Sequence, residues 1–109
     1  MDALARVFKA LGDPTRLRIV NLLARHPWCV CEIQTVLGLP QPLLSRHLAY
    51  LRSAGLVTSH RAGMRVRYSL ASGTPLLRSL LPVLRRDLER DRLGRRDLRR
   101  ACALAARNG

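Results

Sequence analysis

The chain has 109 residues and a net charge of +13, and 48% of its residues are hydrophobic. This length supports one domain over residues 1–109 and excludes a second domain of ordinary size. An excess of positive charge this large is typical of proteins that bind a polyanion.

The number and spacing of the cysteines and the lengths of the apolar stretches further limit the class of protein. The chain has three cysteines, and two of them lie only two residues apart, which is not typical of a secreted disulfide framework. The N-terminal residues lack a basic start followed by an apolar run, and no apolar stretch approaches the length of a membrane span. We therefore expect a cytoplasmic protein with reduced thiols and no membrane partner.

The basic residues are almost all arginines and are unevenly distributed. Every one except Lys9 is an arginine, a residue that forks onto phosphates and guanine edges. Residues 41–68 carry five arginines and no acidic residue, so this segment is purely cationic. A solvated face is the ordinary alternative for a run of charge, but no acidic residue interrupts this one.

Two short amphipathic helices are expected at the N-terminus. The first spans residues 2–11, with Asp2 as its N-cap. The second starts at Asp13 and Pro14, where a capping carboxylate precedes a proline at the first helical position. It continues to about Arg25.

The next two predicted helices form a helix-turn-helix over residues 29–53. A tight turn that contains Gly38 separates them, and Gly55 marks the end of the second helix. Apolar residues of the second helix recur at spacings of four and three and so share one buried face: Leu44, Leu48 and Leu51. In such a motif the second helix enters the major groove of DNA.

After this helix the pattern changes from helical to alternating, which predicts a β-hairpin over residues 56–70. Its turn is expected at Ala62 and Gly63. In the second strand we expect one face to be apolar, made by Met64, Val66, Tyr68 and Leu70. Arg65 and Arg67 face the other way. Directly after a helix-turn-helix, a cationic hairpin is interpreted as a wing; the alternative is an ordinary hairpin with solvated arginines.

A leucine-rich helix is expected over residues 75–107, broken near Pro82 and Gly94. A long apolar stripe in a small domain needs a partner surface. We expect the first helix, from its own or a second subunit, to supply that surface. We call the second helix of the helix-turn-helix the reading helix. A dimer through the first and last helices would present two reading helices to a pseudo-palindromic site.

Four segments carry a resemblance to a known family: residues 8–19 (FKALGDPTRLRI), 29–33 (CVCEI), 41–48 (QPLLSRHL) and 51–57 (LRSAGLV). Together they resemble the ArsR/SmtB family of metal-sensing repressors, and the arsenic-sensing branch most closely. The resemblance implies a mainly α winged helix-turn-helix with a β-hairpin wing. It also implies a homodimer that binds double-stranded operator DNA without a cofactor and releases it when metal binds.

By that resemblance the residues that face DNA are Gln41, Ser45, Arg46 and His47 of the reading helix and Arg61, Arg65 and Arg67 of the wing. Side-chain chemistry agrees, since Gln and Arg can read base edges and Ser can bond phosphate. His47 lies beside the leucine stripe, and an internal hydrogen bond is the alternative for it. Pro40 and Leu43 replace hydroxyl residues common in the family, which removes two groups that could contact phosphate.

Cys29 and Cys31 are the candidate metal ligands. Two thiolates two residues apart can chelate one soft ion. On a regular helix they would differ by about 200°, so we expect the pair at a helix start that can distort. Metal binding there would distort the helix that supports the reading helix and lower DNA affinity. A helix N-terminus is also expected to lower the thiol pKa.

A third sulfur ligand would have to come from outside this pair. Arsenic-sensing members carry a third cysteine where this chain has Gln34. We expect Cys102 to complete a three-sulfur site for As(III) or Sb(III), across a dimer if necessary; the alternative is a small buried residue among alanines. The family's zinc site needs Asp and His ligands on the last helix, but no histidine follows His60. Cys29 and Cys31 with Glu32 could instead hold Cd(II) or Pb(II).

The sequence thus predicts a repressor that controls metalloid resistance genes and releases operator DNA when As(III) or Sb(III) binds. A repressor of the same fold that responds to Cd(II), Pb(II), oxidation or persulfidation is the first alternative. A basic architectural nucleic-acid-binding protein without a sensor is the second. An enzyme is not expected, because the histidines and cysteines show no nucleophile–base arrangement.

Overall fold

The computed structural model describes residues 1–71 and 73–108, and it is mainly helical with one small sheet. In chain order the elements are α1 (Asp2–Leu11), α2 (Pro14–Leu23), β1 (Trp28–Cys29), α3 (Val30–Leu37), α4 (Gln41–Ser53), β2 (Val57–Ala62), β3 (Arg65–Leu70), α5 (Pro75–Arg90) and α6 (Arg92–Asn108).

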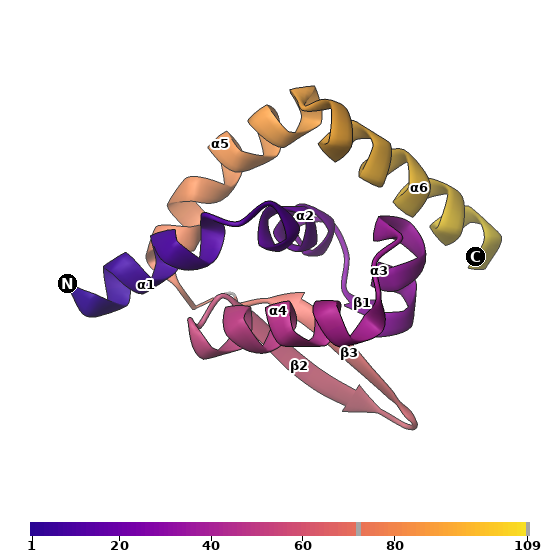
Figure 1. Ribbon diagram of the computed structural model, residues 1–109, viewed down its shortest axis with the longest axis horizontal. Coiled ribbons are helices and arrows are strands. Elements are labelled where there is room, and N and C mark those ends of the chain that lie inside the picture. Colours follow the sequence, from indigo (N-terminus) through magenta and orange to yellow (C-terminus); the bar gives the residue numbers. More distant parts are fainter. Residues whose placement is uncertain (72, 109) are drawn as a thin grey trace.

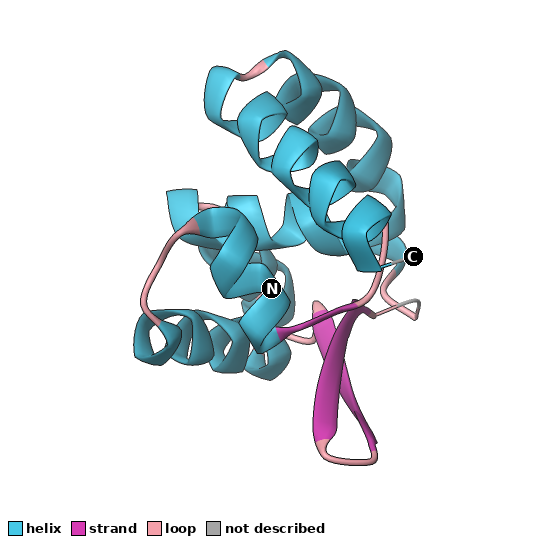
Figure 2. Cartoon of the chain, turned by 90° about the vertical axis from the view of Figure 1, so that its right-hand side faces the viewer, coloured by secondary structure: helices cyan, strands magenta, loops and turns pink. Residues whose placement is uncertain are grey.

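The helices enclose α2, and the hairpin projects from them. Helices α5 and α6 form an inverted V over α2, while α4 runs along the opposite side with β2 and β3 beyond it (Figure 1). Turned by 90°, the hairpin extends well past the helices as a separate arm (Figure 2). This is the predicted winged helix-turn-helix.

The core lies between α2, α3, α4 and the base of the hairpin. The three leucines of the predicted stripe on α4 are completely buried. They pack with Ile19 and Leu22 of α2 and Ile33 of α3 in one cluster. Burial of these apolar side chains is the main stabilising contribution, and it fixes which face of α4 is left for solvent.

Local sequence signals account for two helix ends. Asp13 caps α2, since its Oδ1 accepts hydrogen bonds from the N–H groups of Thr15 at 2.8 Å and Arg16 at 3.1 Å. Gly38 ends α3 with a positive φ of 68°, which a residue without Cβ adopts at little cost. The prediction that Asp2 caps α1 is wrong, because Met1 is the N-cap and Asp2 is already helical.

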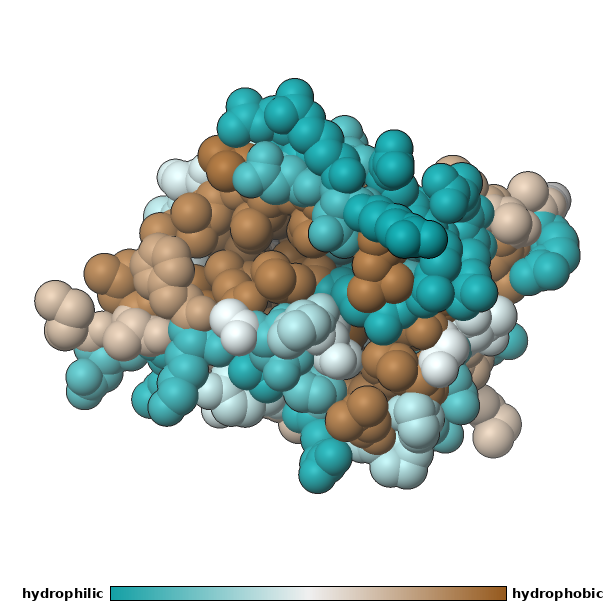
Figure 3. All heavy atoms as spheres, turned by 45° about the horizontal axis from the view of Figure 1, so that its top comes forward, coloured by the Kyte–Doolittle hydropathy of each residue, from teal (hydrophilic) through white to brown (hydrophobic). Residues whose placement is uncertain are grey.

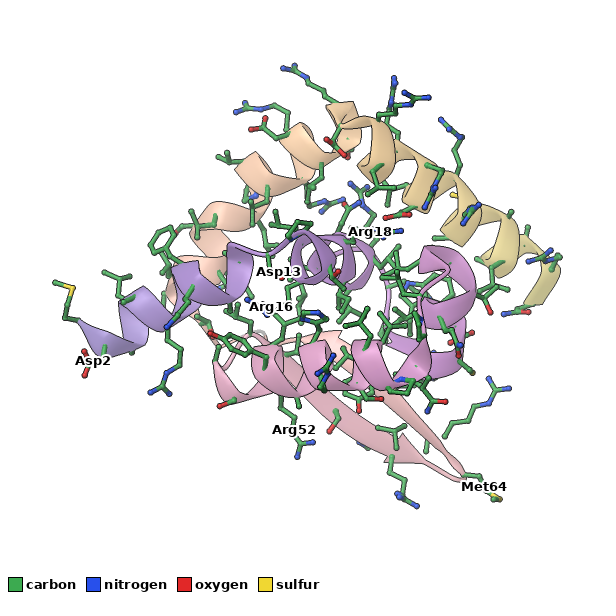
Figure 4. All side chains as sticks on the ribbon, viewed as in Figure 1. Asp2, Asp13, Arg16, Arg18, Arg52 and Met64 are labelled. Carbon is green, nitrogen blue, oxygen red and sulfur yellow. The ribbon has the colours of Figure 1, made fainter. Side chains whose placement is uncertain are left out.

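The sheet contains a strand that the sequence pattern did not indicate. Trp28 pairs with Tyr68 and Cys29 with Arg67, so β1 is antiparallel to β3, and the strand order is β1-β3-β2. The expected position of Met64 on the apolar face of the hairpin is also wrong. Met64 lies in the turn, 99% exposed at the tip of the hairpin (Figure 4), and β3 begins only at Arg65.

The C-terminal segment is divided at Asp91. Helix α5 continues through Pro82, although a kink or break was expected there. The side chain of Asp91 caps α6 by accepting the N–H of Gly94 at 2.9 Å. Gly94 packs so closely on α5 that a Cβ would lie 2.2 Å from the carbonyl oxygen of Leu88. The chain therefore reverses between the two helices, and α6 returns over α2 and α3 (Figure 1).

Candidate nucleic-acid interface and thiol pair

The solvent face of α4 carries the polar residues expected to contact DNA. Gln41, Ser45 and Arg46 are all exposed. Pro40 is the N-cap of α4 and makes no side-chain capping bond, so no hydroxyl group caps this helix end. These three polar side chains and the uncapped N-terminal end of α4 therefore face solvent.

His47 differs from these three, because it is half-buried against α2. Arg16 Nη1 lies 3.2 Å from His47 Nδ1. A guanidinium only donates, so His47 Nδ1 is the acceptor in this contact. This geometry corresponds to the alternative in which the imidazole bonds internally.

Arg16 joins three helices, a role that the sequence analysis missed. Its guanidinium donates to the carbonyl oxygens of Ala10 at 2.7 Å and Lys9 at 3.2 Å, and so closes the C-terminal end of α1. Its Cζ also lies 4.0 Å from the ring centroid of Tyr50 on α4. In Figure 4 Arg16 lies between α2 and α4. Arg16 thus fixes α4 relative to the N-terminal helices.

The three wing arginines are not equivalent. Arg61 and Arg65 are exposed near the tip of the hairpin. Arg67 is half-buried at its base, and its Nη1 donates to the carbonyl oxygen of Pro27 at 3.4 Å. Two of the three are therefore available to a ligand, while Arg67 contacts its own chain.

The structure brings Cys29 and Cys31 together without distorting a helix. Cys29 is the N-cap of α3 and has an extended backbone, with φ −83° and ψ 162°. Cys31 follows in the first turn, and the two Sγ atoms lie 2.9 Å apart. The expected distortion is unnecessary, because the residue before a helix does not follow the helical period. Cys29 is buried and Cys31 is exposed.

The electrostatics of the pair differ from the expectation. Burial and hydrogen bonds with Cys31 and Glu32 raise the pKa of the Cys29 thiol to about 11. The expected lowering by the helix N-terminus is therefore wrong for Cys29. Burial tends to raise the pKa of Glu32, but hydrogen bonds from Cys29 and the charges of Arg67 and Arg65 lower it below 4.5. Its Oε1 accepts the Cys29 N–H at 3.0 Å.

The thiols open into a groove that they share with the reading helix and the wing. The groove is lined by Cys29, Cys31, Gln41, Ser45 and Arg65, among others. A group bound to the sulfurs would therefore lie beside two side chains expected to contact DNA. The sequence could not indicate this proximity, because it depends on the packing of α3 against α4 and on the pairing of β1 with β3.

Cys102 lies elsewhere. It lines a different pocket, between α2, β1 and α6. Within residues 1–71 and 73–108 no three His, Cys, Asp or Glu side chains are close enough to hold a metal ion together. One chain thus supplies two sulfurs at the pair, and its own Cys102 does not complete the site.

Helix α6 is attached to the helix-turn-helix through polar contacts. Arg18 pairs with the buried Asp97 and also donates to the carbonyl oxygen of Leu37 at 2.9 Å. Arg100 Nη1 donates to the carbonyl oxygen of Val36 at 3.3 Å. Both carbonyls belong to the last turn of α3, directly before the turn into α4. The position of α6 is thereby linked to the start of the reading helix.

Comparison with known proteins agrees with this geometry. Residues 13–59 match the family model described as bacterial regulatory protein, arsR family. The structure is similar to HlyU from Vibrio cholerae N16961, with a TM-score of 0.72 and 30% identity over 78% of this chain and 90% of HlyU. The chain belongs to the ArsR family. Members of this family are DNA-binding transcriptional regulators, and neither the fold nor the relatives are those of an enzyme.

Two further relatives of this ArsR-family chain bear on assembly and on the inducer. The winged helix-turn-helix domain of Mb0332 from Mycobacterium bovis, described as homodimeric, has a TM-score of 0.68 and 35% identity, covering 84% of this chain and 86% of that one. The arsenic resistance transcriptional regulator ArsR1 of Pseudomonas putida is 49% identical over 70 residues, which are 63% of this chain and 55% of ArsR1. The match thus spans only about half the length of that relative.

Among the described residues no helix is both long and apolar enough to span a membrane.

Proposed function

We propose that this ArsR-family protein represses genes of metalloid resistance by binding operator DNA and releases that DNA when As(III) or Sb(III) binds to Cys29 and Cys31. The observation that carries the proposal is the 2.9 Å separation of the two Sγ atoms in a groove shared with Gln41 and Ser45. Similarity to ArsR1, an arsenic resistance regulator, supports the choice of inducer.

DNA binding is assigned to the exposed face of α4 and the wing. Gln41, Ser45 and Arg46 would contact the major groove, and Arg61 and Arg65 would contact backbone phosphates beside it. Arg67 and His47 would support these residues from within the protein, because each bonds to its own chain.

A homodimer is assigned to α1 and α5. Large apolar side chains are exposed on these two helices and at the N-cap of α1: Met1, Leu4, Phe8 and Val83. A broad apolar area is visible on this side of the molecule (Figure 3). Contiguous apolar surface of this kind marks an interaction site in small soluble domains. The symmetric dimer would present two copies of α4 to a pseudo-palindromic operator.

Capture of As(III) needs no external base. Arsenious acid carries three hydroxyl groups; each thiol forms an As–S bond and gives its proton to a departing hydroxide, so two thiols release two waters. The third position keeps its hydroxide or takes Cys102 of a second subunit. The donor set therefore fits the metalloid in two of three positions.

Capture would also move the support of the reading helix. Each thiol gives up its proton when its sulfur bonds to arsenic, so the two sulfurs no longer share a hydrogen bond. The Sγ–Sγ contact of 2.9 Å is therefore lost. Cys29 is buried, so Cys31 in the first turn of α3 is the thiol free to shift. That shift, and the bound group itself, would displace Gln41 and Ser45 across the groove.

The proposal is tested by titrating As(III) into a complex of the protein with a fluorescent operator fragment. Cys29→Ser and Cys31→Ser should each retain operator affinity and lose As(III)-induced release. Cys102→Ser is the matched thiol control: unchanged release assigns the site to the pair alone, and weaker release assigns the third position to Cys102. Release that persists in both pair variants would overturn the proposal.

A redox switch at the same thiols is the second candidate, because the short Sγ–Sγ separation also favours a disulfide. Hydrogen peroxide would take two electrons and two protons from the thiols, form the S–S bond and leave as two waters. Intact mass after peroxide or after As(III) distinguishes the two: loss of two hydrogens indicates the disulfide, and gain of one arsenic indicates capture.

A further inference from the structure

A second pocket, distinct from the thiol groove, lies where α6 crosses α2 and β1. It has a volume of about 220 Å³ and is lined mainly by apolar side chains, among them Leu22, Trp28, Leu98 and Ala101. His26 and Cys102 also line it. Both are exposed, so they lie on its solvent side, whereas Trp28 is buried.

The size and lining of this pocket match a small aromatic molecule. An apolar cavity of about 150 Å³ is sufficient to bind benzene, so this pocket can hold a substituted ring. The indole of Trp28 supplies a flat wall, with the His26 ring centroid 4.6 Å from it and tilted by 47°. A ligand ring can pack on this pair, as aromatic rings commonly do.

The polar groups around the pocket favour a neutral ligand over an anion. Arg25 also lines the pocket, but its Nη2 already pairs with Glu89 at 2.8 Å. The imidazole of His26 can donate or accept one hydrogen bond, and the Cys102 thiol can do so weakly. One hydroxyl or carbonyl on the ligand would satisfy this side of the pocket.

We propose that this pocket binds a small neutral aromatic molecule with one hydrogen-bonding group, and that its occupancy is coupled to the reading helix through α6. Leu98 and Ala101 lie one and four residues after Asp97 on α6. A ligand ring that packs on these two side chains and on Trp28 would shift α6 relative to α2, and the Arg18–Asp97 pair joins the same two helices. Arg18 also donates to the carbonyl oxygen of Leu37, so a change in this pair reaches the turn before α4. The inference goes beyond the proposed function, since it does not involve the thiol pair.

The test uses Trp28, the only tryptophan in the chain, as its reporter. The probe is 4-bromobenzyl alcohol, a ring with one hydroxyl and a heavy atom that quenches indole emission. Ala105 lines the pocket and is exposed, so Ala105→Phe should fill it; Ala106→Phe, one residue further along α6, is the matched control. We expect saturable quenching in the native protein and in Ala106→Phe. The apparent Kd should be about tenfold or more weaker in Ala105→Phe.

Equal quenching in both variants, or quenching that never saturates, would overturn the binding site. The second measurement needs no pocket variant: the alcohol should slow labelling of Cys102 by benzyl methanethiosulfonate in a Cys29→Ser/Cys31→Ser protein. Labelling that is slow from the start and unaffected by the alcohol would mean that a second subunit covers the pocket, which also overturns the proposal.

The coupling is tested with the operator complex. The alcohol should weaken operator binding by the native protein and by Ala106→Phe, and have little effect on Ala105→Phe. Saturable quenching with unchanged operator affinity would overturn the coupling. Quenching of Trp28 does not depend on DNA or arsenic, so it tests the pocket even if the proposed function fails.

Discussion

Arg18 and Asp97, 79 residues apart, form a bidentate ion pair that joins α2 to α6. The Nε and Nη2 atoms of Arg18 donate to Asp97 Oδ2 at 2.8 Å and Oδ1 at 3.1 Å. The Asp97 side chain is completely buried, and that of Arg18 is 13% exposed. Figure 4 places Arg18 on the side of α2 that faces α6. Because Nη2 also donates to the carbonyl oxygen of Leu37, one guanidinium connects three helices.

Asp97→Asn is therefore expected to destabilise the protein by about 3–5 kcal/mol, because it leaves the Arg18 charge buried without its partner. Urea unfolding followed by circular dichroism measures the change. Removing both charges in Arg18→Met/Asp97→Leu should recover much of the loss. Glu89→Gln, which breaks an exposed pair with Arg25, is the control and should leave the unfolding midpoint unchanged. A loss in Asp97→Asn no larger than in Glu89→Gln would contradict the assignment.

Glu32→Gln should lower the pKa of the Cys29 thiol from its value of about 11. Burial is the largest cause of the raised pKa and remains, but the hydrogen bond with the carboxylate and its negative charge also raise the pKa and would be removed. The pH dependence of thiolate absorbance at about 240 nm measures this change. Both proteins carry Cys31→Ser and Cys102→Ser, so that the thiolate signal comes from Cys29 alone. Loss of the Cys31 hydrogen bond lowers the starting pKa equally in both, and the difference between them is the effect of Glu32. An unchanged or higher pKa would show that Glu32 does not act on this thiol.

The pH dependence of affinity should distinguish arsenic from the divalent alternatives. Binding of Cd(II) or Pb(II) must release the Cys29 proton, so affinity should rise about tenfold per pH unit for that proton, at pH values below the pKa of about 11. As(III) arrives as a neutral hydroxide, and its hydroxyl groups take up the thiol protons as water. Its affinity should be nearly flat from about pH 6 to about pH 8. Competition titrations with a chromophoric chelator or dithiol provide the measurement, and a steep rise for As(III) would contradict the exchange chemistry.

The sequence predicted the features that depend on neighbouring residues. The leucine stripe of α4 and the capping of α2 by Asp13 follow local rules, and both are present. Pro82 was expected to disturb α5, since proline has no N–H to donate to the carbonyl oxygen one turn earlier. Pro82 lies on the exposed side of α5, so water can hydrogen-bond that carbonyl and the helix continues. The break at Asp91 depends instead on a capping bond and on the close approach of Gly94 to Leu88.

The features that depend on distant residues could not be predicted. Strand β1 has two residues and exists through its pairing with β3, so no periodicity marks it. In the sequence Asp97 lies among arginines and resembles a solvent-exposed residue. In the structure it is completely buried and paired with Arg18. Cys29 lies at a helix start as expected, but its pKa is raised, because burial and the hydrogen bonds with Cys31 and Glu32 favour the neutral thiol. The groove that the thiols share with α4 likewise depends on contacts between residues distant in the sequence.

The last prediction concerns the wing, where Arg65→Ala and Arg67→Ala should have different effects on DNA binding. Arg65 is exposed near the tip, so its loss should weaken binding to all sequences and reduce the salt dependence of log K by about one. Arg67 donates to the carbonyl oxygen of Pro27, and its charge helps to lower the pKa of Glu32. Its loss should change the salt slope little and should affect the thiol pair instead.

Fluorescence anisotropy of operator and scrambled DNA over a range of salt concentrations measures both slopes. Arg46→Ala on α4 completes the set, with an expected loss of about 1–3 kcal/mol on operator DNA alone if Arg46 contacts a base. Arg95→Ala is the control for loss of one positive charge, because Arg95 is exposed near the start of α6, the end of that helix far from the hairpin (Figure 1). Equal salt slopes for Arg65→Ala and Arg95→Ala would show that the wing does not contact phosphate, because net charge alone would then explain the effect.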